Sequence, residues 1–397
     1  MFDGFLNLPW WGELICVLAA THLTIISVTL YLHRCQSHRA VTLHPFVSHI
    51  FRAWLWLTTG QGTKQWVAVH RKHHACTERE DDPHSPHVHG IKKVLFEGTE
   101  LYRKAAADSR ICQEFGHGTP EDWIEDNLYT RFSNSGLGLL MLVYIALFGP
   151  IGLTYWAIQM IWIPFFAAGV VNGGGHYWGY RNFETQDGST NLFNLGVLIG
   201  GEELHNNHHA YPSSARFSMR WWEFDIGWLY LRILSGLGLA EVKKVAPQPV
   251  KNKSINKERL DINAVRMMVS SRLHIMADYA RHVTMPVLKA EISQAEGHYR
   301  SALKRIKKAL VRERSRMTAP QIEYLNQVLH DSLQLKTVYE YQQRLLQVWT
   351  QKYHSNEGML CAIAEWCQEA EATGIRVLED FARSLKSYSI QPVYNHA

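Results

Sequence analysis

One stretch of this sequence constrains the fold more than any other: residues 132–180 contain no Lys, Arg, Asp or Glu. These 49 residues are long enough for two membrane-crossing helices, because each crossing needs ~20 mostly apolar residues. Gly149-Pro150 marks the turn between them, since glycine and proline both interrupt helices. We therefore predict spans over about 136–153 and 154–175.

A further span is expected near the N-terminus, where residues 10–32 read WWGELICVLAATHLTIISVTLYL. This segment has no basic residues ahead of it and no small-residue cleavage site, so we do not expect a signal peptide. Residues 46–62 are short and amphipathic and predict a helix lying at the membrane interface. A short true span is the alternative for that segment.

Basic residues indicate the orientation. Lys and Arg are missing from residues 1–33 and from the turn at 149–154, whereas 34–131 and the chain from 181 onward carry all of them. By the positive-inside rule, the His-rich segments and the C-terminal part lie on the cytoplasmic side of a multi-pass protein.

Histidine is concentrated in three clusters with metal-ligand spacing. They are H-x4-H at His33 and His38, H-x2-H-H at His70, His73 and His74, and H-x2-H-H at His205, His208 and His209. Residues three or four apart share a helix face, and the five-residue spacing of the first cluster is expected to straddle a helix end. One cluster could arise by chance, but three on one membrane face indicate metal binding. Eight histidines exceed one tetrahedral zinc site and suggest two metal ions, without identifying the metal.

Other polar residues lie near these clusters. His176 follows three glycines at the end of the last span and is either a ninth ligand or an ordinary interfacial histidine. Asn172, one helical turn earlier, could hold a metal-bound water or cap the helix. Asp82 and His84 are expected to contact the metal ligands, and a separate metal-binding segment at this loop is the alternative. Glu202 and Asn206 are also expected to contact the ligands.

Over roughly residues 20–230, these motifs resemble the membrane fatty-acid desaturases, and most closely the acyl-CoA (stearoyl-CoA type) Δ9 branch. The resemblance rests on HRCQSHRA from His33, HRKHHA from His70 followed by DPHS, NGGGH ahead of YWGYR, and GEELHNNHHAYP. It implies that Asn172 binds metal through water and that nine histidines are ligands: His33, His38, His70, His73, His74, His176, His205, His208 and His209.

The resemblance also implies a reaction. The family uses two iron ions, O2 and two electrons to place a double bond in a saturated acyl chain, here expected to be a cis double bond at Δ9 of an acyl-CoA, with the metal centre acting without a separate acid or base residue. No cytochrome-b5-type H-P-G-G, no cysteine set for an iron–sulfur cluster and no G-x-G-x-x-G is found, so a separate reductase and ferredoxin-like carrier are expected. This layout suggests a bacterial inner-membrane enzyme.

Several alternatives stay open. A di-iron hydroxylase of alkyl or lipid substrates would need the same metals and O2. A metal transporter would need polar residues deep within the spans to make a path, and the 132–180 stretch has none that are charged. Acyl-CoA, phospholipid and acyl-carrier substrates are all compatible with the sequence. The family commonly has four spans, whereas 32 residues precede His33, so three or four membrane segments are compatible too.

The last part of the chain is different in character. Residues 246–256 read as a linker, and from 256 onward 35 of 142 residues are charged, with apolar positions at helical spacing. Thr318 to Gln321 has the pattern of a helix-starting capping box. Residues 304–316 are strongly basic, which fits a solvated face, or contact with anionic lipid or with an acidic electron carrier.

Together these features predict an all-α protein. Residues 1–245 would form an integral membrane helical domain with a cytoplasmic His-rich cap for two metals, and residues 257–397 a soluble helical bundle without a catalytic motif. A hydrophobic content of 46% excludes intrinsic disorder. A net charge of +5 does not indicate a nucleic-acid partner.

Overall fold

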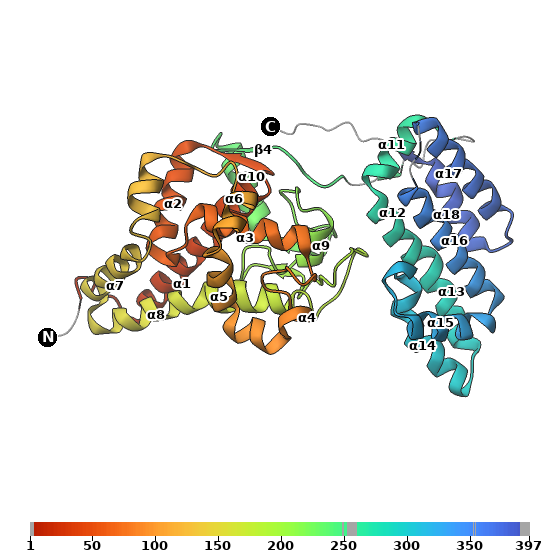
Figure 1. Cartoon of the computed structure of the whole chain (residues 1–397), viewed down its shortest axis with the longest axis horizontal. Coiled ribbons are helices and arrows are strands. Elements are labelled where there is room, and N and C mark those ends of the chain that lie inside the picture. Colours follow the sequence, from red (N-terminus) through yellow and green to blue (C-terminus); the bar gives the residue numbers. More distant parts are fainter. Residues whose placement is uncertain (1–3, 248–249, 252–259, 352, 354, 390–397) are drawn as a thin grey trace. The chain divides into compact units, whose positions relative to one another are not determined.

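The computed structural model describes residues 4–247, 250–251, 260–351, 353 and 355–389 (Figure 1). Within them the chain forms two compact units. Unit 1 comprises the chain up to Arg181 and Asp187–Ala246, and unit 2 comprises Asn182–Gln186 and the described residues from Pro247 onward. Most of the predicted linker, 246–256, lies outside the described residues.

Two continuous helical stretches of unit 1 are long and apolar enough to cross a membrane. The first, Trp10–Ser37, joins α1 (Trp10–Ser27) to the π-helix η1 (Val28–Ser37). The second, Ser135–Gly174, takes in the remaining membrane-candidate elements: α7 (Ser135–Phe148), η3 (Gly149–Ile151), α8 (Gly152–Ile163) and η4 (Pro164–Gly174).

The second stretch is a hairpin, in which α7 and α8 lie side by side (Figure 1). The chain turns at Gly149, whose φ of 71° is a left-handed conformation that glycine adopts without a Cβ clash. Across the hairpin, Trp156 Nε1 donates to the Leu137 carbonyl at 3.0 Å. Gln159 Nε2 donates to the Tyr144 hydroxyl at 2.6 Å. These two bonds pair the Trp156 indole N–H and the Gln159 amide nitrogen inside the apolar stretch.

Glycines allow η4 to pack closely on α5 (Ile91–Ala106). A Cβ at Gly98 would lie 2.6 Å from the Ala168 carbonyl oxygen, and one at Gly169 would lie 2.5 Å from the Leu95 carbonyl oxygen. Because these neighbours are backbone atoms, only glycine permits this separation. The contact fixes the end of η4, just ahead of His176.

The other helices of unit 1 surround these stretches. They are α2 (Pro45–Thr59), α3 (Thr63–Cys76), α4 (Pro86–His89), α6 (Ser109–Phe115), η2 (Glu125–Thr130), α9 (His205–Ala210) and α10 (Ile226–Gly236). The segment expected at the interface is α2, which buries Val47, Phe51 and Leu55 and exposes Phe46 and Ile50.

Strands are short and pair in twos. In unit 1, β1 (Val41–Leu43) is antiparallel to β4 (Ala240–Val242), and β2 (Leu195–Gly196) is parallel to β3 (Phe224–Asp225). In unit 2, β5 (Val250–Lys251) is antiparallel to β6 (Tyr388–Ser389). The expectation of a mostly helical protein is therefore confirmed, with these small strand pairs added.

Unit 2 contains a series of helices around one apolar core, which includes Met268, Tyr279, Val338, Trp366 and Leu385. Its helices are α11 (Ile262–Ser270), α12 (Arg272–Tyr279), η5 (Ala280–Thr284), α13 (Met285–Gln294), α14 (Gly297–Val311), η6 (Arg314–Arg316), α15 (Ala319–His330), α16 (Leu333–Thr350), α17 (Asn356–Glu371) and α18 (Arg376–Lys386). The capping box predicted at Thr318 and Gln321 is confirmed at the start of α15.

Candidate metal centre

Nine histidine side chains converge in unit 1 from four parts of the chain. The end of η1 supplies His33 and His38, α3 supplies His70, His73 and His74, the turn after η4 supplies His176, and α9 supplies His205, His208 and His209. These are the nine positions that the sequence singled out, and the structure brings all of them together.

The first pair is aligned by the π-helix. His38 N–H donates to the His33 carbonyl at 3.0 Å, an i to i+5 hydrogen bond. This wide turn brings the two imidazole rings to 4.8 Å between centroids. The pair does lie at a helix end, as expected, but the π-helical turn is what places both rings on one side.

The nine rings divide into two groups, each with ligand atoms within 4.8 Å of one another. The five-histidine group is His33, His38, His70, His74 and His208, and the four-histidine group is His73, His176, His205 and His209. Both H-x2-H-H boxes are therefore split: in each, the residues four apart belong to one group and the remaining histidine to the other. The sequence pattern alone predicts instead that the three histidines of each box share one helix face.

The spacing of ring nitrogens fits bound metal ions. The Nε2 atoms of His33 and His74 lie 3.1 and 2.9 Å from the Nε2 of His208. The corresponding distance in the four-histidine group is 3.0 Å between His176 and His205. Metal–nitrogen bonds of ~2.1 Å at right angles separate neighbouring ligand nitrogens by about 3 Å. In addition, the Nε2 atoms of His73 and His209 are buried without a hydrogen-bond partner.

Burial favours the neutral form of four of these imidazoles. It lowers the pKa of His70, His74, His205 and His208 well below the usual value, because the charged form would be desolvated. A neutral imidazole offers a lone pair to a metal ion, so burial favours the state of these four rings that ligation requires.

Carboxylates outside the two groups orient the rings. Four of them accept a hydrogen bond from the Nδ1 of one ring each: Glu202 from His33 at 2.6 Å, Asp82 from His73 at 2.9 Å, Asp187 from His209 at 2.9 Å, and Glu78 from His176 at 3.3 Å. A carboxylate that fixes the proton on Nδ1 leaves Nε2 free to bind metal.

The sequence indicated only two of these carboxylates. Asp82 and Glu202 were expected beside the ligands, whereas Asp187 and Glu78 were missed. Glu78 is followed closely by Glu80 and Asp81, and the sequence does not distinguish the acidic residue that faces a histidine. A positive φ of 63° at Glu78 is the structural sign that sets it apart.

The carboxylates differ in their electrostatics. Hydrogen bonds and the nearby imidazoles His73, His209 and His176 hold the pKa values of Asp82, Asp187 and Glu78 below the usual range, against the effect of burial. At Glu202, burial dominates and raises the pKa to about 8, so this carboxyl can itself carry a proton beside His33 and fixes that ring's tautomer less firmly than the other three carboxylates fix theirs. Burial also raises the pKa of the neighbouring Glu203 to about 7.

The remaining predicted residues lie nearby. His84 is buried, stacks on His73 at 4.4 Å, and forms a third small group with His73 and Asp82. Asn206 donates to the Ser189 hydroxyl at 3.4 Å. Asn172 lies half-buried on η4, four residues before His176.

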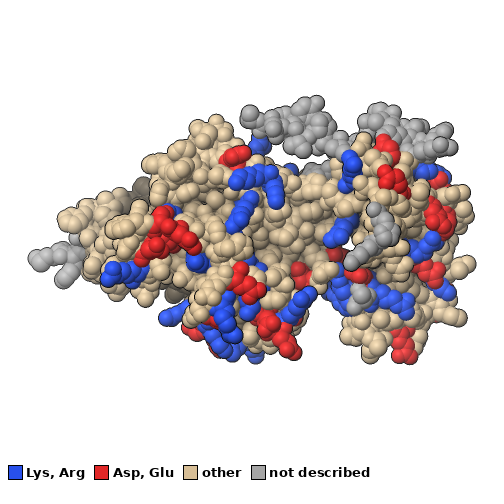
Figure 2. Space-filling view, turned by 45° about the horizontal axis from the view of Figure 1, so that its top comes forward, with Lys and Arg blue, Asp and Glu red and all other residues tan. Residues whose placement is uncertain are grey.

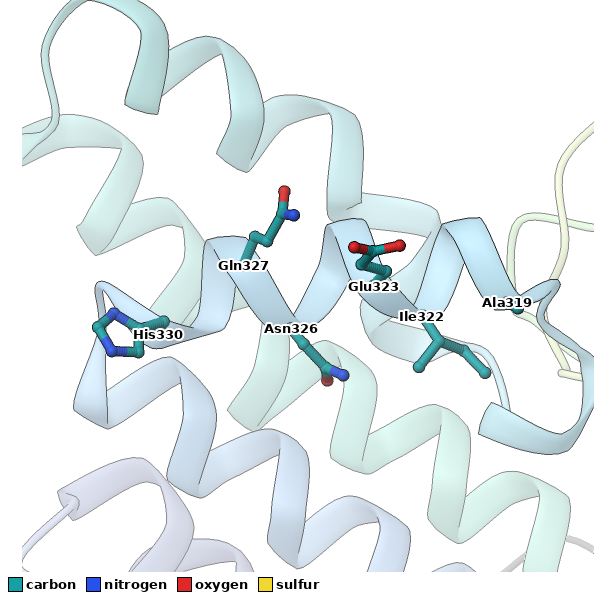
Figure 3. A pocket seen from close by; sticks show the side chains of 6 residues that line it. All are labelled: Ala319, Ile322, Glu323, Asn326, Gln327 and His330. Atoms are coloured by element: carbon teal, nitrogen blue, oxygen red, sulfur yellow. The ribbon is translucent and has the colours of Figure 1, made fainter.

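Unit 2 has no comparable cluster among its described residues, since each of the three groups lies in unit 1. It does have an open pocket along α15 (Figure 3), lined by Ala319, Ile322, Glu323, Asn326, Gln327 and His330. One carboxylate and one imidazole on a single helix do not make a metal site.

Comparison with protein families gives two matches. The model described as fatty acid desaturase matches residues 8–235, which contain all nine histidines. A model described as transposase matches residues 263–393, in unit 2.

Individual relatives of this chain are also named as desaturases. A Synechocystis protein named sn-1 stearoyl-lipid 9-desaturase is 32% identical over 56% of this chain and 69% of its own length. An Anabaena variabilis protein of the same name is 31% identical over 56% of this chain and 79% of its own. The acyl-CoA 5-desaturase AL21 of Anemone leveillei is 33% identical over 58% of this chain and 70% of its own.

Proposed function

Because this chain belongs to the fatty acid desaturase family, we propose that it is a membrane-bound di-iron enzyme that introduces a cis double bond at Δ9 of a saturated acyl chain. The observation that carries the proposal is the pair of histidine groups, one of five rings and one of four. The reaction removes two hydrogens from adjacent methylenes, while O2 takes up these hydrogens, two electrons and two protons to give two molecules of water.

The proposed ligands follow the two groups. One iron would be held by His33, His38, His70, His74 and His208, and the other by His73, His176, His205 and His209, with Asn172 reaching it through a water. Bound iron would supply O2 activation, which unactivated methylenes need because they have no acidic proton. The protein buries most of these rings, and the carboxylates of Glu202, Asp82, Asp187 and Glu78 orient four of them.

The substrate class is argued from relatives. Two of the proteins compared are named for stearoyl-lipid desaturation at position 9 and one for acyl-CoA desaturation at position 5. We propose Δ9 as the position, as in the two proteins named for it, and acyl-CoA as the carrier, as in the third. An acyl-lipid is the other carrier, and the test distinguishes the two.

The setting would be a lipid bilayer. α7 and α8 expose large apolar side chains, including Leu142 at 61% and Ile161 at 64%, and such faces are typical of lipid contact. Figure 2 shows largely uncharged surface at the far left, the end where α7 and α8 lie in Figure 1. We propose a multi-pass protein of the bacterial inner membrane with its histidines and C-terminus cytoplasmic, served by a reductase and a ferredoxin-like carrier.

A fatty-acyl profile tests the activity. Cells expressing the full chain are expected to accumulate a monounsaturated species, with the double bond located by gas chromatography–mass spectrometry. His208→Ala removes a ring of the five-histidine group and should reduce that species to the background of non-expressing cells. His49→Ala, an exposed histidine on α2, is the matched control and should retain it.

Labelled stearoyl-CoA and labelled phospholipid, given separately to membranes, identify the carrier. Hydroxylated product would replace the desaturase proposal with the hydroxylase alternative. If no product forms, an iron count near zero on purified protein would overturn the di-iron proposal.

A further inference from the structure

Glu78 has a backbone conformation that an ordinary side chain disfavours. Its φ of 63° is left-handed, a conformation that glycine adopts more readily than a residue with a Cβ. Its own N–H donates to Asp82 at 2.8 Å, which anchors the turn after α3. A glutamate at such a position points to a role for its side chain.

The Glu78 carboxylate joins three separate segments. The same oxygen, Oε1, accepts from the Gly188 N–H at 2.5 Å and from His176 Nδ1 at 3.3 Å. His87 lies beside them, with its Nε2 at 3.7 Å from that oxygen and 3.1 Å from the His176 carbonyl. The turn after α3 is thus tied to both ends of the 176–188 loop.

Gly188 is shaped for this contact. A Cβ at residue 188 would lie 2.6 Å from Glu78 Oε1. Since that atom is the end of a flexible side chain, an alanine there would displace the carboxylate without forcing the backbone to move. The missing side chain at Gly188 therefore leaves the space that the Glu78 carboxylate occupies.

We infer that Glu78 is a positioning residue for the four-histidine site: it holds the proton of His176 on Nδ1 and so directs Nε2 toward the metal. Nε2 of His176 indeed faces Nε2 of His205, at 3.0 Å. The five-histidine group has no contact of this kind with Glu78 among the described residues. This inference rests on the proposed di-iron function and adds a residue to it that acts on one of the two sites.

The test is Glu78→Gly in the full-length, iron-loaded protein. Glycine suits the left-handed backbone, which offsets part of the lost hydrogen bonding, so the metal-free variant should unfold close to the wild-type temperature. Loss of an outer hydrogen-bond partner typically costs ~10–100-fold in metal affinity, so chelator competition should release one iron from the variant about that much more readily. The second iron should behave as in wild type.

Further variants make the result specific. Glu78→Gln keeps the accepting oxygen but not its charge, so it should fall between wild type and Glu78→Gly. Gly188→Ala should displace the Glu78 carboxylate and so lower iron affinity as Glu78→Gly does. Glu80→Gly, at an exposed glutamate in the same turn, is the control and should retain both irons. In 57Fe Mössbauer spectra, Glu78→Gly should change the component that His176→Ala changes.

Two results would overturn the inference. One is wild-type iron affinity and spectrum in Glu78→Gly. The other is equal loss of both irons together with lowered thermal stability, which would show a general structural role. If the wild-type protein itself binds fewer than two irons, the proposed di-iron function fails instead.

Discussion

The imidazole rings of the centre use their two nitrogens differently. His73 Nδ1 faces Asp82 while its Nε2 is buried without a hydrogen-bond partner. His209 has the same arrangement with Asp187. Because each carboxylate can only accept, it fixes the tautomer, and the free nitrogen of each ring points into the four-histidine group. Among the described residues, that group has three such carboxylates, and the five-histidine group has one, Glu202.

A prediction at the residue scale concerns the two cysteines of α17. Cys361 is exposed, whereas Cys367 is 1% exposed and burial raises its pKa to about 12. Only a thiolate reacts with alkylating reagents. At pH 8 in native protein, Cys361 should be labelled by a maleimide and Cys367 should remain unlabelled, as read by peptide mass spectrometry. Denaturant should make both react, and rapid native labelling of Cys367 would contradict the packing of unit 2.

At the scale of elements, the contact between α5 and η4 depends on having no side chain at the crossing. A Cβ added at Gly98 or Gly169 would lie 2.6 or 2.5 Å from a backbone carbonyl oxygen of the other element. η4 leads directly to His176, so the separation of these two helices also sets where that ring lies.

The corresponding prediction is that Gly98→Ala destabilises unit 1. A backbone carbonyl cannot swing away, so the helices must separate, at a cost of ~1–3 kcal/mol typical of overpacking. Gly138→Ala is the control, because a Cβ there meets nothing within 4 Å and alanine favours a helix. Thermal unfolding in detergent should show a lower midpoint for Gly98→Ala and an unchanged or higher one for Gly138→Ala. The reverse order would contradict the close contact of α5 with η4.

At the scale of the whole molecule, the metal-ligating groups found among the described residues are confined to unit 1, while unit 2 has its own core. Trp366 lies in that core, 2% exposed, with its indole N–H donating to the Tyr341 carbonyl at 3.0 Å. The independence of the metal centre from the core of unit 2 can be tested in the intact chain.

Trp366→Ala is expected to destabilise unit 2 by ~3–5 kcal/mol, as for large-to-small changes in a core. The iron content of the chain should stay at the wild-type value. Tyr324→Ala, at a residue 36% exposed on α15, should leave the unfolding midpoint nearly unchanged. Differential scanning calorimetry with iron analysis measures both, and iron loss in Trp366→Ala would show that the centre depends on unit 2.

The amino-acid sequence by itself determined the composition of this centre and its helical frame. Three boxes of histidine, a charge-free stretch with Gly149-Pro150 at its middle, and the capping box at Thr318 are local patterns, and local backbone preferences suffice to interpret them. Eight histidines could be named in this way, with Asp82 and Glu202 expected beside them, and the family resemblance added His176.

Only the tertiary structure decided how those histidines are shared. His73 lies next to His74 in sequence yet belongs to the other group, because adjacent residues on a helix point about 100° apart and the elements around α3 take up both directions. Glu78 and Asp187 could not be recognised for a similar reason. Each contacts a histidine that lies 98 or 22 residues away in the chain, and such contacts are fixed by packing between distant segments, which no local pattern records.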